Sequence, residues 1–279
     1  MSAHTSFLAH ERFKWFKLSA WLCLIIIVVY SAYSPIGGRN GGTWVGYGLG
    51  TIGLLIILWL AWLGVKKRGF AAGSHSIRGW TSAHVYLGLS LTIIATLHTG
   101  FEFGWNVHTL AYTLMMLVIV SGAYGVFAYV RYPRLMSDNM SGASSAGLRK
   151  ELADLDVRLA RLTQRLPDSF AEAARLSLDN TKIGGGFFKL LGGSSKGCGS
   201  ARGRDLAREQ AAALTDSGQQ TVATEMVATL SRKAEIAARL RRDLGYKAAM
   251  DVWLWLHVPM TLGLIASLAA HVLIVFFYW

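Results

Sequence analysis

The sequence contains few cysteines, few prolines and few charged residues. Two of its 279 residues are cysteine, four are proline, and Asp, Glu, Lys and Arg together make up 16%. Cys23 lies in an apolar run and Cys198 in a glycine-rich stretch, so a disulfide framework, a cysteine-rich zinc site and an iron–sulfur cluster are excluded. With 53% hydrophobic residues, the charge is also too sparse for an ordinary soluble protein. Any metal chemistry must use other ligands, and the eight histidines are the candidates.

Five apolar segments are each long enough to cross a bilayer as a helix. They lie at about residues 17–34, 44–65, 80–101, 107–130 and 250–279. The first contains the unbroken run LCLIIIVVY and could instead be a cleaved signal peptide, but no convincing small-x-small cleavage site follows it. The sequence therefore predicts an all-α integral membrane bundle of five transmembrane helices.

Basic residues gather at the same end of successive spans. They precede the first span, join the second to the third, follow the fourth and precede the fifth: Arg12, Lys14, Lys17, Lys66, Lys67, Arg68, Arg78, Arg131, Arg134, Arg241, Arg242 and Lys247. Of the two remaining connections, one carries only Arg39 and the other has no basic residue. Because basic flanks stay in the cytoplasm, we expect a cytoplasmic N-terminus and an outer C-terminus, in a bacterial inner (plasma) membrane.

A hydrophilic, basic segment lies between the fourth and fifth spans. Six leucines in it follow an alternating spacing of four and three residues, which is typical of a coiled-coil seam: Leu148, Leu152, Leu155, Leu159, Leu162 and Leu166. A weaker apolar stripe follows at Val222, Met226, Leu230, Ala237, Leu240 and Leu244, and eight glycines lie between Gly184 and Gly203. We expect a cytoplasmic antiparallel hairpin with a flexible basic tip, and a division of the chain into 1–131, 132–248 and 249–279.

Four histidines lie inside the predicted spans: His84 and His98 in the third, His257 and His271 in the fifth. Each pair is 14 residues apart, so both members lie on one side of a helix, about 21 Å apart along its axis. Because both spans run in the same direction, His84 is level with His257 and His98 with His271. Ionisable groups at membrane depth are usually functional, although histidines that bond to Ser and Thr hydroxyls between helices are an alternative.

Two facing imidazoles at each of two levels suit haem iron, because the porphyrin supplies four of the six ligands. Zinc would need three or four protein ligands at one place. We therefore expect two b-type haems, one on His84 and His257 and one on His98 and His271. Iron with six ligands has no open position, so these haems would transfer electrons only, and we expect no catalytic residue in the chain.

Weaker candidates lie near these levels. Gly50 and Gly64 are also 14 residues apart and would let a haem approach the helix backbone, although generic helix packing explains them equally well. Arg78 could pair with a haem propionate or simply serve the positive-inside pattern. Glu102 and His108 could form a quinone site beside the His98 level, although an interfacial histidine among aromatic residues is the simpler interpretation of His108.

With these residues in view, the chain resembles the di-haem cytochrome b subunit of quinol-oxidising bc-type complexes. There, H-x13-H pairs on the second and fourth helices of a four-helix bundle hold two haems, and segments two to five would match that bundle. The ferric-reductase and NADPH-oxidase superfamily uses closely similar spacings. The extra first span, the insertion and the lack of the later quinol-site helices depart from the cytochrome b pattern, so only the haem ligands carry over.

The resemblance implies a subunit that carries electrons between a quinone or an outer-face donor or acceptor and a cytoplasmic redox partner. Any flavin would have to come from that partner, which we expect to be a flavin or iron–sulfur subunit. The excess of basic residues in the insertion would attract an acidic partner surface or anionic lipid. The alternatives are a transmembrane ferric or oxygen reductase subunit and a non-redox scaffold or sensor, and no nucleic-acid partner is expected.

Overall fold

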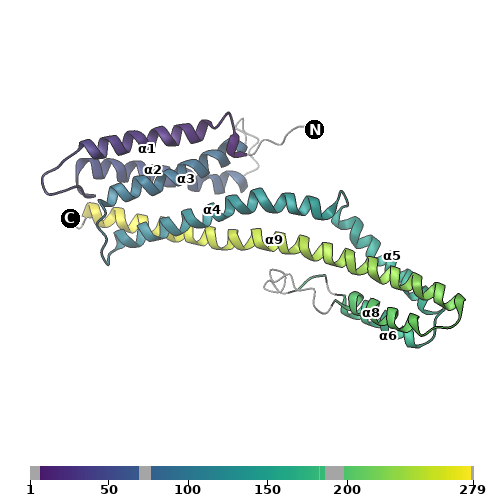
Figure 1. Cartoon of the computed structure of the whole chain (residues 1–279). Coiled ribbons are helices and arrows are strands. Elements are labelled where there is room, and N and C mark those ends of the chain that lie inside the picture. The colour runs from purple at the N-terminus through teal and green to yellow at the C-terminus, as the bar shows by residue number, and fades with distance from the viewer. Residues whose placement is uncertain (1–6, 69–76, 182, 186–197, 278–279) are drawn as a thin grey trace. The chain divides into compact units, whose positions relative to one another are not determined.

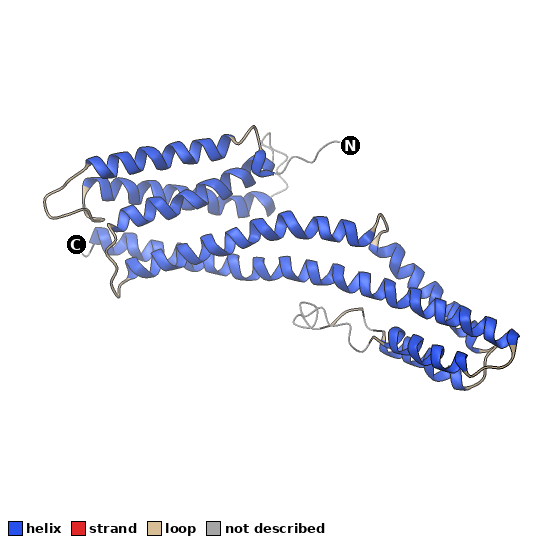
Figure 2. Cartoon of the chain, in the orientation of Figure 1, coloured by secondary structure: helices blue, strands red, loops and turns tan. Residues whose placement is uncertain are grey.

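A computed structural model of the chain describes residues 7–68, 77–181, 183–185 and 198–277. Across these ranges the regular structure is entirely helical (Figure 2), and five of the helices are long and apolar enough to cross a membrane. This confirms the predicted all-α integral membrane bundle. The chain divides into two compact units, one formed by Met1–Phe127 with Trp253–Trp279 and the other by Ala128–Val252.

The first unit contains the membrane-spanning segments, with labels as in Figure 1. It contains the short 3-10 helix η1 (Phe7–Ala9), α1 (Lys14–Ala32), α2 (Trp44–Arg68), α3 (Ile77–Thr99), and parts of α4 (Val107–Met140) and α9 (Ser217–Phe277). One buried apolar cluster joins the last four of these helices through Ile57, Leu60, Leu91, Met115 and Leu264. A second cluster packs Ile26 of α1 against Leu49 and Ile94. Most other apolar side chains of α1 stay exposed, as a lipid-facing helix requires.

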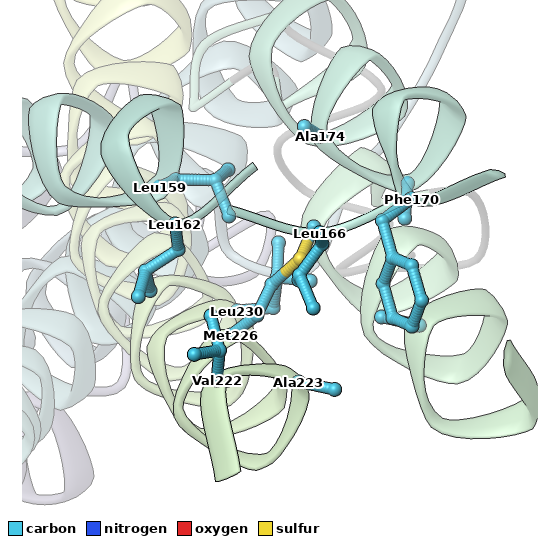
Figure 3. Packing of buried hydrophobic residues seen from close by; sticks show 11 residues of the cluster. Leu159, Leu162, Leu166, Phe170, Ala174, Val222, Ala223, Met226 and Leu230 are labelled. Atoms are coloured by element: carbon cyan, nitrogen blue, oxygen red, sulfur yellow. The ribbon is translucent and has the colours of Figure 1, made fainter. Parts of the chain in front are cut away.

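The second unit is built around the leucine seam. Helix α5 (Ser145–Thr163) begins at Ser144, whose Oγ accepts a hydrogen bond from the amide of Gly147 at 2.9 Å and so satisfies one free helix-end donor. Leu148 and Leu152 of α5 share a cluster with Ile236 and Leu240 of α9. Farther along α5, the seam packs on an earlier part of α9, as Figure 3 shows for Leu159, Leu162, Met226 and Leu230. The two helices are therefore antiparallel.

The second unit is more than a two-helix hairpin. Two further helices, α6 (Ser169–Asn180) and α8 (Gly199–Ala212), lie between α5 and α9 in the sequence and contribute Phe170 and Ala207 to the same core. Gly203 of α8 contacts the backbone carbonyl of Ala173, and a side chain there would prevent this close approach. The predicted flexible tip falls largely on residues 186–197, outside the described residues.

One nearly buried charge joins three helices of the second unit. The side chain of Lys233 on α9 is 4% exposed, and its Nζ contacts Asp156 of α5 and donates to the carbonyl of Ser177 on α6 at 3.0 Å. Asp156 is 37% exposed and so keeps some of its hydration. By contrast, the ion pair between Arg158 and Glu225 lies at the surface.

Candidate functional site

The predicted ligands lie on two unbroken helices. His84 and His98 belong to α3 and His257 and His271 to α9, and all four side chains are half-buried. Each 14-residue spacing is therefore a true helical distance of about 21 Å along the axis.

Two leucines set these helices in register. Leu91 is seven residues from both histidines of α3, and Leu264 is seven residues from both histidines of α9. Both leucines are almost fully buried, at 3% and 2% exposure, in the same apolar cluster. The midpoints of the two pairs therefore lie at one level.

His98 is held by the backbone of α2. Its Nδ1 lies 2.8 Å from the carbonyl oxygen of Gly46. Because a carbonyl only accepts hydrogen bonds, Nδ1 must carry the proton and Nε2 keeps a lone pair that can bind a metal. Gly50, one turn farther along α2, faces the same ring, and Gly41 approaches it from the connection before α2.

His257 is held by Ser121 of α4. The Ser121 Oγ lies 2.8 Å from Nδ1 of His257 and donates to the carbonyl of Val118, also at 2.8 Å. A hydroxyl has one proton. When that proton goes to the Val118 carbonyl, Ser121 accepts from Nδ1 of His257, and Nε2 of His257 keeps the lone pair.

Glycines of α4 let the side chains of His257 and Trp253 pack closely against the helix. A β-carbon on Gly122 would lie 3.4 Å from Cε1 of His257. The indole of Trp253 occupies the position that a β-carbon of Gly125 would need, and its ring centre is 5.4 Å from that of His257. The histidine spacing gives no indication of Ser121, Gly122 or Gly125. Their spacing, small residues on one helical face, is a common sign of close helix contact in membranes.

His271 lies between two other histidines. The ring centres of His98 and His271 are 6.0 Å apart, with nearly perpendicular planes. Nδ1 of His108 on α4 also lies close to this ring, 2.5 Å from Nδ1 of His271. The structure thus brings together His98 and His271, as the spacing predicts, and adds His108 to them.

Three other predicted site residues lie near the ends of α2 and α3. Arg78 is exposed at the start of α3, and Glu102 is exposed in the connection after α3. Gly64 belongs to α2, but its surroundings lie outside the described residues.

An N-terminal contact near His84 was not anticipated from the sequence. The hydroxyl of Tyr86 donates to the carbonyl of Leu8 at 3.1 Å, which places η1 against α3 two residues beyond His84. His10 lies against Gly79 near the start of α3, with Nε2 2.9 Å from where a β-carbon would be. Nothing in the pattern of the polar N-terminal tail distinguishes these residues.

Among the residues that the structure describes, no group of three or more His, Cys, Asp or Glu side chains is arranged to hold a metal ion. A tetrahedral zinc site needs such a group, whereas a haem needs two axial ligands. In comparisons with models of protein families, with curated proteins and with solved structures, nothing matches this chain.

Proposed function

We propose that the chain is an electron-transfer subunit of a membrane oxidoreductase and holds two b-type haems. His84 and His257 would ligate one haem, and His98 and His271 the other. The observation that carries the proposal is the way these rings are held. The carbonyl of Gly46 accepts from Nδ1 of His98 and leaves Nε2 with its lone pair, and the Ser121 hydroxyl lies 2.8 Å from Nδ1 of His257. Metal-ligating histidines characteristically donate their other ring nitrogen in this way.

Space and separation support the same assignment. Two imidazoles that ligate one metal from opposite sides, with bonds of about 2 Å each, have ring centres about 6 Å apart. The centres of His98 and His271 are 6.0 Å apart. Gly50 beside His98 and Gly122 beside His257 let helix backbone approach each ring closely.

The bound haem would supply a one-electron change of the iron. The protein supplies the ligands and an apolar environment between the two levels, because Leu91, Leu264 and Met115 fill the interior of the bundle there. A low-dielectric interior of this kind disfavours stray charge, and two axial ligands would leave each iron without an open position for substrate. The role of the chain is therefore conduction through the membrane.

The charge pattern favours a cytoplasmic N-terminus in a bacterial inner (plasma) membrane. The second unit would then be cytoplasmic and would dock a flavin or iron–sulfur subunit. A quinone would exchange electrons at the opposite end, close to Glu102 and His108.

Haem content and four single variants test the proposal. The purified full chain should contain two haems by pyridine haemochrome assay. His84→Leu and His257→Leu should each remove one and the same haem, and His98→Leu and His271→Leu the other. The control His10→Leu should keep both. A wild-type stoichiometry near zero, or an unchanged spectrum after all four ligand substitutions, would disprove it.

A further inference from the structure

His108 is the third histidine at the level of His98 and His271, and it comes from a third helix, α4. Its Nδ1 lies 2.5 Å from Nδ1 of His271, and the ring centres are 4.5 Å apart with planes at 89°. Two ring nitrogens can approach this closely only when one carries a proton and the other a lone pair. The contact is therefore a directed hydrogen bond between two imidazoles.

The direction of this bond follows from the proposed function, on which the inference rests. To ligate iron through Nε2, a neutral His271 must carry its proton on Nδ1. His271 is then the donor and His108 the acceptor. We infer that His108 is a positioning residue, which fixes the ring orientation and tautomer of His271 for its haem.

Two of the other three proposed ligands have a comparable contact. The carbonyl of Gly46 accepts from Nδ1 of His98, and the hydroxyl of Ser121 lies 2.8 Å from Nδ1 of His257. For His271, the side chain of His108 on α4 contacts the same ring nitrogen, Nδ1. An acceptor on Nδ1 increases the electron donation of the ring to the metal and so favours the ferric state. Without it, the haem on His98 and His271 becomes easier to reduce.

Three substitutions of His108 distinguish the effect of its hydrogen-bond acceptor from the effect of its size. The Oδ1 of asparagine can occupy nearly the position of histidine Nδ1 and only accepts, whereas the oxygen of glutamine lies one carbon farther out. Leucine fills the space without any acceptor. The full chain in detergent is titrated potentiometrically, with His98→Leu identifying which haem belongs to this level. Leu110→Ala, an exposed position on the same helix, is the matched control.

In His108→Leu and His108→Gln, we expect the ferric-to-ferrous equilibrium of this haem to shift about tenfold towards ferrous, which is about 59 mV. The second haem should keep its potential. His108→Asn and Leu110→Ala should resemble the wild type, and the low-spin ferric electron paramagnetic resonance signal of the affected haem should change only in the Leu and Gln variants.

The possible failures are distinguishable. A wild-type chain without haem overturns the proposed function and this inference together. Two haems with an unchanged potential in His108→Leu overturn only the positioning role, as does a His108→Asn variant that behaves like His108→Leu. If His108→Leu and His108→Asn lose the haem while His271→Leu keeps it, His108 is itself the ligand and the inference is wrong.

Discussion

Gly50 lies so close to His98 that a β-carbon on Gly50 would be 2.7 Å from Cε1 of the imidazole and 3.1 Å from its Nδ1. No ordinary carbon–carbon contact is that short, and the neighbouring α2 carbonyl that fixes the ring, from Gly46, cannot move without distorting the helix. The packing of this pair therefore requires glycine at position 50 as long as His98 keeps its orientation.

Gly50→Ala should displace His98 and weaken its haem. We expect the affinity for this haem to fall by about 10–100-fold, the effect usual for disturbing what orients a metal ligand. Gly48→Ala is the matched control, because a β-carbon there meets nothing within 4 Å on the same helix. Haem content and the reduced-minus-oxidised spectrum of both purified variants provide the measurement. Equal haem content in the two variants would contradict the tight packing.

Gly125→Ala should disturb the other level through Trp253. The added methyl group would overlap the indole, and overpacking of this kind destabilises by about 1–3 kcal/mol. Because Trp253 lies next to His257, the haem of the His84–His257 pair should show the spectral change. Gly263→Ala, in open space on α9, should be neutral or slightly stabilising. Identical thermal unfolding curves and spectra for the two variants would contradict this prediction.

Breaking the contact between Asp156 and Lys233 should lower the free energy of unfolding by different amounts, depending on which of the two residues is replaced. Asp156→Ala leaves a charge that is only 4% exposed without its partner, which costs about 3 kcal/mol or more. Lys233→Met should cost less, because the remaining carboxylate is 37% exposed and methionine can fill the space. Urea unfolding of the full chain, monitored by amide hydrogen exchange in α5 and α6, measures the stability of both variants.

The surface pair of Arg158 and Glu225 is the control for that experiment. Glu225→Gln should cost no more than about 1 kcal/mol, because exposed ion pairs contribute little. If Asp156→Ala is as mild as Glu225→Gln, then Lys233 is hydrated in solution and the burial of its charge is not a feature of the protein.

The quinone prediction is tested with quinol-driven haem reduction in proteoliposomes. Glu102→Gln removes the carboxylate as a proton acceptor and should slow reduction at least tenfold if it takes the quinol proton. His108→Asn, which keeps the hydrogen-bond acceptor for His271, isolates any role of His108 in proton transfer. A rate unchanged in both variants, with normal haem content, would remove the quinone from this end of the bundle.

Partner docking should depend on basic residues on α5 and just after its end. A surface hollow of about 390 Å³ is lined by Arg158 and Arg161 of α5, by Arg165 beyond it, and by the acidic residues Asp154 and Glu225. Arg161→Glu with Arg165→Glu should reduce co-purification of a flavin or iron–sulfur subunit and leave both haem spectra intact, because opposite charges accelerate encounter. Arg175→Glu, exposed on α6, is the control. Unchanged co-purification but weaker binding to anionic vesicles would assign the charge to lipid contact instead.

The periodicity of the sequence predicts those features that depend on the spacing of residues along a single helix. The five spans, the leucine seam and the placement of each histidine pair follow from hydrophobic runs and from intervals of 14 residues. These features were foreseeable because helix geometry is the same in every protein. The register of α3 and α9 was foreseeable for the same reason, once both were taken to run in one direction.

Contacts made by single side chains between helices could not be foreseen. Spacing does not reveal that Ser121 faces His257 or that His108 reaches His271, because rotation and tilt of α4 are set by packing. Helices α6 and α8 were also missed. In α8 the apolar residues are mostly alanine and glycine, which give a weak hydrophobic pattern although Ala207 is fully buried. In α6 the pattern is clearer, with Phe170, Ala173 and Ala174 buried.

The first unit is formed by two separate stretches of the chain, and this has a consequence for biosynthesis. Its core takes Ile57, Leu91 and Met115 from one part of the chain and Leu264 from another, with the whole of Ala128–Val252 translated in between. At about 5–20 residues per second, that interval lasts roughly 6–25 s. During it, the growing chain carries His84 and His98 but neither His257 nor His271. Cofactor loading, if it requires both ligands, is therefore a late step that follows insertion of the last helix.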